Sequence, residues 1–260
     1  MRVMGLQLDC VWENKAANHA KVLSLLERAK PEPETLVVLP EMFATGFSMN
    51  VKGIEDTESR ETQDFLSRAA AEFKVYLAAG VVTTNAEGRG LNQCVVHAPD
   101  GNEMARYSKM QPFTLGGESD NYAAGAQPII FNCLEFTVAP FICYDLRFPE
   151  IFRAAVARGA NLFLVIASWP VMREDHWLTL LKARAIENQS YVVGVNRCGD
   201  DPKLHYSGRS IVFDPGGKCL ADAGNEEGWM EAPLELQDLI EYRKQLPFLE
   251  DMRQGYVNFR

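Results

Sequence analysis

The chain alternates between two patterns of apolar positions. Short apolar runs rich in β-branched residues predict strands in the first half at residues 2–8, 35–39, 75–83, 91–98 and 103–107. Between them, apolar residues recur at helical spacing from Val22 to Ala29 and again from Phe65 to Phe73, which predicts two amphipathic helices. Strand and helix signals that alternate in this way are typical of α/β proteins.

The second half follows the same pattern without repeating the sequence. Apolar runs predict strands at residues 129–131, 136–142, 161–167, 191–196, 208–213, 218–221 and 228–232, the first two as a hairpin. Helices are predicted from Pro149, which suits a first turn, to Arg158, and from Glu174 to Asn188. These are too many strands for a simple doubly wound sheet. We therefore expect an α/β fold with two sheets, each covered by helices.

Composition favours one domain over residues 1–260. Hydrophobic residues make up 47% of the chain, enough for a large core, and no Ser/Gly/Pro-rich stretch or long run of like charge separates two halves. The net charge of −9 disfavours nucleic acid or an acidic membrane surface as a partner. Asp9 interrupts the apolar N-terminal stretch, and no apolar run is long enough to span a bilayer. A soluble, cytoplasmic protein is expected.

The six cysteines are widely scattered and predict neither a disulfide framework nor a metal site. No C-x-x-C pair occurs, and no histidine lies at zinc-ligand spacing. We therefore expect free thiols in a reducing compartment, most of them buried as small apolar side chains.

Three residues lie where predicted strands end, the position from which α/β folds usually present functional groups. Glu41 lies between Pro40 and Met42, in a setting where partial burial suits a carboxylate to proton transfer. Lys109 has aromatic and apolar neighbours, and Cys143 stands between an apolar strand and a predicted helix. Each also has a simpler interpretation, as a loop glutamate, a surface lysine and a core cysteine.

Taken together, the three segments resemble the nitrilase, or carbon–nitrogen hydrolase, superfamily. That family carries Pro-Glu after a strand, a Lys followed a few residues later by Phe, and a Cys-Tyr-Asp-x-Arg-Phe-Pro segment. All three occur here in the same chain order, around Glu41, around Lys109 and at residues 143–149. The joint match favours a catalytic role for Glu41, Lys109 and Cys143 over the simpler interpretations.

Two further segments extend the resemblance. Glu118 falls where the family has a second glutamate, and residues 41–47 resemble the bacterial ω-amidase branch. A solvated loop glutamate is the alternative for Glu118. The resemblance implies a four-layer α-β-β-α sandwich and homodimers that extend the sandwich across the interface.

The chemistry that the resemblance implies passes through a thioester. Cys143 attacks the amide carbon, Glu41 serves as the base, and the oxyanion is held by the Lys109 ammonium and the backbone N–H of Tyr144. Glu118 orients Lys109 or the hydrolytic water. No metal or organic cofactor is needed for these steps.

The ω-amidase branch implies a small-molecule amide as the partner, namely the ω-amide of a short 2-oxo dicarboxylate such as 2-oxoglutaramate or 2-oxosuccinamate. Its free carboxylate needs a fixed cation, for which Arg147 is the candidate. The alternative for Arg147 is a structural ion pair with Asp145 or Glu150. Phe43 and Trp169 are candidates for the pocket wall, with ordinary core packing as their alternative.

The sequence also leaves competing functions open. A nitrilase, an N-carbamoyl-amine hydrolase or an aliphatic amidase would use the same catalytic residues with another pocket. A catalytically idle binding or scaffold protein would keep only the fold. A papain-like Cys/His hydrolase is disfavoured, because none of the four histidines lies in a recognisable pattern with Cys143.

Overall fold

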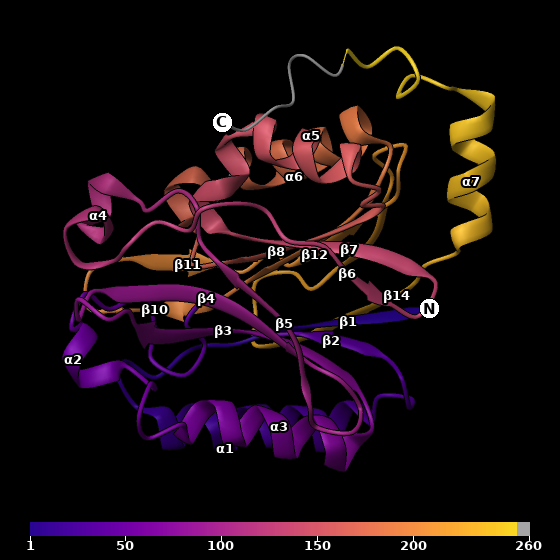
Figure 1. The fold of residues 1–260 in the computed structure, drawn as a ribbon. Coiled ribbons are helices and arrows are strands. Elements are labelled where there is room, and N and C mark those ends of the chain that lie inside the picture. Colours follow the sequence, from indigo (N-terminus) through magenta and orange to yellow (C-terminus); the bar gives the residue numbers. More distant parts are fainter. Residues whose placement is uncertain (254–260) are drawn as a thin grey trace.

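The computed structural model describes residues 1–253 and consists of two sheets packed face to face between two layers of helices (Figure 1). The first sheet contains, in spatial order, β14 (Gly228–Pro233), β1 (Arg2–Gln7), β2 (Leu36–Val38), β3 (Tyr76–Thr84), β4 (Gly90–His97) and β5 (Glu103–Ser108). Strands β1, β2 and β3 run parallel, and the remaining pairs are antiparallel. The expected single domain also includes residues 254–260, which lie outside the described residues.

The second sheet has the same plan, with three parallel strands flanked by antiparallel ones. It contains, in spatial order, β13 (Cys219–Asp222), β12 (Ile211–Phe213), β9 (Tyr191–Asn196), β8 (Leu162–Ala167), β7 (Phe136–Ile142) and β6 (Phe131–Cys133). A separate two-stranded hairpin is formed by β10 (Cys198–Asp200) and β11 (His205–Ser207).

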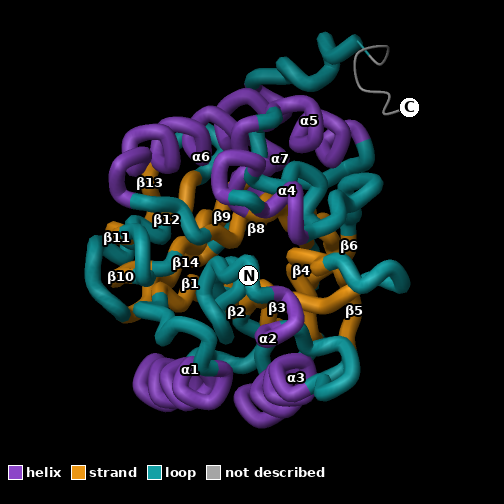
Figure 2. The backbone as a smooth tube through the Cα atoms, turned by 90° about the vertical axis from the view of Figure 1, so that its left-hand side faces the viewer, coloured by secondary structure: helices purple, strands orange, loops and turns teal. Residues whose placement is uncertain are grey.

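Helices cover the outer face of each sheet, as the two views show (Figures 1 and 2). Helices α1 (Lys15–Ala29) and α3 (Glu61–Phe73) lie on the first sheet, and α5 (Pro149–Ala157) and α6 (Glu174–Asn188) on the second. Short helical segments connect the layers: α2 (Val51–Ile54), α4 (Glu118–Asn121), η1 (Thr114–Gly116), η2 (Cys143–Arg147) and η3 (Val171–Arg173). Helix α7 (Leu236–Gln245) follows β14 at one side of the sandwich.

Strand alternation divides the interior into two apolar clusters. In β2, Leu36 and Val38 face the second sheet, whereas Val37 faces the helices of its own side. Both faces of the central strands are therefore buried, which explains why their sequences read as continuous apolar runs. The larger cluster contains side chains from both sheets, so the sheets share one core.

The predicted α/β fold with two helix-covered sheets is confirmed, and several elements match closely, among them α6 and β9. Two strand predictions are wrong in position. Ile129 and Ile130 pack on the core as partly buried residues ahead of β6, so their pattern reflects burial and not pairing. Gly208 and Arg209 have positive φ, at 68° and 56°, so the strand expected from residue 208 begins at Ile211.

The β10–β11 hairpin and α7 were missed. The hairpin turn contains Asp, Pro and Lys and reads as an ordinary loop. Helix α7 buries only Leu239 of its ten residues and is held in part by Arg243, whose Nε donates to the Gln189 carbonyl at 2.9 Å. Within residues 1–253, no helix is both long and apolar enough to cross a membrane.

Candidate active site

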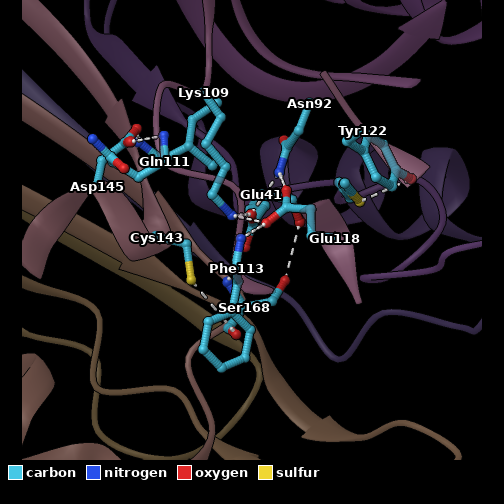
Figure 3. Close-up of polar contacts among 12 residues, drawn as sticks. Glu41, Asn92, Lys109, Gln111, Phe113, Glu118, Tyr122, Cys143, Asp145 and Ser168 are labelled. Carbon is cyan, nitrogen blue, oxygen red and sulfur yellow. Dashed lines mark hydrogen bonds and ion pairs between the residues drawn. The ribbon is translucent and has the colours of Figure 1, made fainter. Parts of the chain in front are cut away.

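The predicted catalytic residues converge at one end of the sandwich, where strands of both sheets terminate. Glu41 follows β2 and Lys109 follows β5 of the first sheet, while Cys143 follows β7 and Ser168 follows β8 of the second. Because β7 and β8 run parallel, their carboxyl ends meet at the same edge. Figure 3 shows Glu41, Lys109 and Cys143 close together, with the Cys143 sulfur directed toward the Ser168 carbonyl oxygen. The structure thus brings the predicted residues Glu41, Lys109 and Cys143 together, with Ser168 beside them.

The Glu41 segment lies unusually close to strand β3. A Cβ atom added at Gly80 would stand 2.3 Å from the backbone nitrogen of Met42 and 2.7 Å from the Cα of Glu41. Only glycine permits this approach, which is reinforced by a 3.2 Å hydrogen bond from the Gly80 N–H to the Pro40 carbonyl. Gly80 therefore sets the depth at which Glu41 enters the site.

Lys109 is held between two carboxylates in the interior. Its Nζ donates to Glu41 Oε1 and to Glu118 Oε2, both at 2.8 Å, and all three side chains are 0–1% exposed. Burial lowers the pKa of Lys109, but Glu118 and Glu41 raise it more, so this pKa lies well above its usual value. The lysine is therefore a fixed ammonium, and the surface interpretations of Glu41, Lys109 and Glu118 are wrong. We call these three residues the ion cluster.

Asn92, on β4, is a member of this network that the sequence analysis missed. Its Nδ2 donates to Glu41 Oε1 at 2.7 Å and to Glu118 Oε1 at 2.8 Å, while its Oδ1 has no hydrogen-bond partner among the described residues. The Phe113 N–H adds a 2.6 Å bond to Glu118. Each carboxylate of the ion cluster thus accepts several donors, as a buried charge requires.

Cys143 occupies a strained elbow between β7 and η2. Its φ is +48°, a left-handed value uncommon for a residue with a side chain, and its Sγ lies 3.8 Å from the Ser168 carbonyl oxygen. Ser168 also contacts Glu41, since its N–H donates to Glu41 Oε2 at 2.8 Å. Burial and the Glu41 carboxylate raise the pKa of the thiol well above its usual value, against the opposing effect of Lys109. At rest the thiol is therefore neutral.

A cavity of about 410 Å³ opens in front of Cys143. Three of the predicted residues, Tyr144, Arg147 and Trp169, contribute to its wall, as does Phe47, whose ring lies 5.3 Å from Lys109 Nζ. The lining residues are Trp12, Phe47, Met49, Phe113, Leu115, Gly116, Cys143, Tyr144, Arg147, Ser168, Trp169, Pro170, Arg173, Asp201, Pro202, Lys203, Leu204 and Tyr206. Among residues 1–253, no histidine lines the cavity. The alternative of a papain-like Cys/His hydrolase therefore has no geometric support.

The prediction that Phe43 walls the pocket is wrong. Phe43 is fully buried in the cluster between the first sheet and its helices, with ring centroids 6.0 Å from His19 and 6.4 Å from Phe65. The chain turns at Met42 and Gly46, where φ is +46° and +73°, so the aromatic ring that reaches the cavity is Phe47.

Arg147 forms neither of the ion pairs that the sequence left open. Its guanidinium lies over the Trp169 ring, 4.7 Å from the centroid, and Nη2 stands 3.3 Å from His176 Nδ1. Asp145 instead accepts hydrogen bonds from Tyr107 and from the Gln111 N–H. Arg147 is thus available to the cavity that it lines.

Comparison with known proteins agrees with this site. The carbon–nitrogen hydrolase family model matches residues 2–244. The chain is 34% identical to a 2-oxoglutaramate amidase of Bacillus subtilis, covering 95% of this chain and 96% of that protein. It is 37% identical to omega-amidase YafV of Yersinia enterocolitica, covering 96% of both. The chain therefore belongs to the carbon–nitrogen hydrolase family, and it is a hydrolase that acts on carbon–nitrogen bonds.

Solved structures confirm the fold. A CN-hydrolase superfamily protein of Xanthomonas campestris, described with an arsenic adduct in its active site, superposes with a TM-score of 0.92 at 32% identity, covering 98% of this chain and 97% of that one. Nit3 of Saccharomyces cerevisiae, a member of branch 10 of the nitrilase superfamily, gives a TM-score of 0.88 at 26% identity, covering 98% and 96%. The expected four-layer sandwich of this superfamily is confirmed.

Proposed function

We propose that this protein is an ω-amidase, which hydrolyses the ω-amide of short 2-oxo dicarboxylates such as 2-oxoglutaramate and 2-oxosuccinamate to the acid and ammonia. The observation that carries the proposal is a buried ion cluster beside a cavity thiol, in a chain similar over nearly its whole length to amidases of this kind. A hydrolytic thiol requires a base and a cation close by, and both stand at this site.

The charge of the cavity supports an anionic substrate. Its described lining includes three cationic side chains, Arg147, Arg173 and Lys203, and one carboxylate, Asp201. Asp201 is occupied within its own hairpin, accepting from the Tyr206 hydroxyl at 2.6 Å and from the N–H groups of Lys203 and Leu204. In a protein of net charge −9, this local excess of cations suits a substrate carboxylate, which we assign to Arg147.

Acylation begins when the thiol proton of Cys143 passes to Glu41. The sulfur forms a bond to the amide carbon, and the resulting oxyanion is stabilised by the Lys109 ammonium and by the Tyr144 N–H, which lies in the first turn of η2 where N–H groups have no partner inside the helix. Glu41 then returns the proton to the nitrogen as the carbon–nitrogen bond breaks. Ammonia leaves and a thioester remains on Cys143.

Deacylation uses the same groups in reverse. Glu41 takes a proton from a water molecule, whose oxygen attacks the thioester carbon, and the proton is then transferred to the departing sulfur. Glu118 keeps Lys109 oriented through both half-reactions, since its carboxylate binds Nζ at 2.8 Å. Trp169 and the stacked Arg147 form the wall against which the substrate chain lies.

Three further assignments belong to this proposal. The chain acts as one catalytic domain over residues 1–260, because the two sheets share one core. It works in the cytoplasm, which fits six free cysteines of which only Cys219 is exposed. It forms a homodimer, as its resemblance to the superfamily implies, and sedimentation velocity tests this assignment.

Ammonia release from 2-oxoglutaramate by the wild type and by Cys143→Ala tests the function and the nucleophile together. A nitrile, an N-carbamoyl amino acid and a neutral aliphatic amide serve as competing substrates. We expect turnover of the ω-amide in preference to all three, and its disappearance in Cys143→Ala.

Preference for one of the competing substrates would move the protein to another activity of the same family. Turnover that survives in Cys143→Ala would refute the thioester mechanism. No turnover of any amide, with folded protein, would favour the binding or scaffold alternative.

A further inference from the structure

Asp145 stands two residues after Cys143, fully buried in η2. Its Oδ2 accepts hydrogen bonds from the Ile142 N–H at 2.9 Å and from the Tyr107 hydroxyl at 2.8 Å. Its Oδ1 accepts from the Gln111 N–H at 2.9 Å, a contact visible in Figure 3. One carboxylate therefore holds three donors.

These donors come from the two segments that carry the nucleophile and the cation. Ile142 directly precedes Cys143, whereas Tyr107 and Gln111 lie two residues before and two after Lys109. Strand β7 belongs to the second sheet, and β5 is the edge strand of the first. Asp145 thus connects the two sheets beside the place where Cys143 and Lys109 must face the same substrate carbonyl.

A carboxylate is needed at this position because both of its oxygens must accept. An asparagine has nearly the same shape, but its amide nitrogen is a donor and would meet an N–H or hydroxyl donor in place of one carboxylate oxygen. Burial raises the pKa of Asp145 to about 7, while the hydrogen bonds from Ile142, Tyr107 and Gln111 act in the opposite direction and favour the carboxylate. Burying an ionisable carboxyl group costs folding free energy, which indicates that Asp145 has a role beyond packing.

We propose that Asp145 is a positioning residue whose carboxylate fixes the placement of Lys109 Nζ relative to Cys143 Sγ. This inference rests on the proposed amidase function, in which one group attacks the carbonyl carbon and the other stabilises the oxyanion. A misplacement of about 1 Å between such groups can cost on the order of 100-fold in rate.

The test is Asp145→Asn in a Cys219→Ser background, which removes the exposed thiol from the assay. We expect kcat for 2-oxoglutaramate to fall roughly 10- to 100-fold with KM changed less than about 2-fold, because the substrate-binding wall is untouched. Lys109 lowers the pKa of the Cys143 thiol, so its displacement is also expected to slow alkylation of Cys143 by iodoacetamide at pH 8, followed by mass spectrometry.

Asp56→Asn is the matched control. Asp56 is also a buried carboxylate, and it accepts hydrogen bonds from the N–H groups of Thr62 and Gln63, both at 3.0 Å, at the start of α3 and outside the cavity lining. Its substitution is expected to lower the melting temperature while kcat and the alkylation rate stay at the wild-type level.

The proposal is overturned if Asp145→Asn keeps the wild-type kcat and alkylation rate, or if Asp56→Asn lowers both as much. If Asp145→Asn does not fold, Tyr107→Phe decides, because it removes one donor of the three: a kcat roughly 3- to 10-fold lower supports the proposal, and an unchanged kcat refutes it. A wild type inactive on ω-amides refutes the function alone, since the alkylation comparison still tests Asp145.

Discussion

The ion cluster and the cavity wall differ in burial and in how firmly their side chains are fixed by neighbouring groups. Glu41, Lys109 and Glu118 are sealed from solvent, and each bonds to groups that are themselves fixed. The cavity wall is built from loops and short helical segments, with Leu115 90% exposed at its rim and Lys203 on an exposed hairpin turn.

This difference indicates that the ion cluster is suited to catalysis and the cavity wall to selecting the substrate. Buried charges with fixed partners need no reorganisation during the reaction and work in a low dielectric, which favours catalysis. Loop side chains can change without disturbing the core, which favours divergence of specificity. Substitutions in the ion cluster should therefore affect kcat and stability, and substitutions in the wall should affect KM.

The largest effect is expected from Lys109→Met. This change leaves two buried carboxylates without their cation and removes an oxyanion donor, so kcat should fall on the order of 1000-fold. Stability should fall by about 3–5 kcal/mol, as for other broken buried ion pairs. Ammonia release and urea unfolding measure the two effects. Lys203→Met, on the cavity wall, is the control and should leave stability nearly unchanged; equal losses in the two variants would contradict the comparison.

A smaller but still large effect is expected from Gly80→Ala. The new Cβ would collide with the backbone of Met42 and Glu41, and displacement of the base should lower kcat on the order of 100-fold. Steady-state kinetics checks this expectation. Gly228→Ala is the matched strand variant, because a Cβ there meets no atom within 4 Å; wild-type kinetics in Gly80→Ala would show that Glu41 is placed by other contacts.

On the cavity wall, Arg147→Gln should act on binding. Loss of a charge-assisted hydrogen bond to the substrate carboxylate is expected to raise KM for 2-oxoglutaramate roughly 10- to 100-fold, with kcat changed less than about 3-fold. A neutral aliphatic amide should show no such change, and Arg147→Lys should recover part of the affinity. A rise in KM that is equal for charged and neutral amides would assign Arg147 to the structure of the wall.

The smallest effect is expected from Phe43→Leu, which tests the boundary between core and wall. Because Phe43 is buried away from the cavity, its truncation should cost about 1–2 kcal/mol of stability and leave kcat and KM within about 2-fold of wild type. Trp169→Leu, in the wall, should raise KM. A substrate-dependent change in Phe43→Leu would mean that the cluster beneath the site shapes the cavity.

The sequence predicted those parts of the fold that depend on local pattern. Strands buried on both faces, such as β8 and β9, give apolar runs that signal their type and place. Glu41 and Cys143 follow runs of this kind, whereas Lys109 follows the edge strand β5, in which only Tyr107 is buried. The motifs around them supplied their chain order. A joint role for these three residues could therefore be hypothesised from the sequence.

The contacts that complete the site could not be predicted. Asn92 stands inside a strand, where a polar residue usually marks the solvent face. Its role depends on Nδ2 reaching two carboxylates, Glu41 and Glu118, from distant segments of the chain. Phe47 lines the cavity in place of the predicted Phe43. This difference depends on the left-handed backbone of residues 42 and 46, which the local sequence pattern does not reveal. The Asn92 contacts and the position of Phe47 both depend on how segments distant in the sequence are placed relative to one another in the fold.

The neutral state of the resting Cys143 thiol has a consequence for the lifetime of the enzyme. Peroxides oxidise thiolates far faster than thiols, so a nucleophile that stays protonated between turnovers is protected from conversion to sulfenic and higher acids. Because the proposed mechanism forms the thiolate chiefly during turnover, oxidative damage should accumulate mostly per catalytic cycle and less per hour of storage. An enzyme idle in a cell under peroxide stress would then keep its activity, while a working one would wear out in proportion to its output.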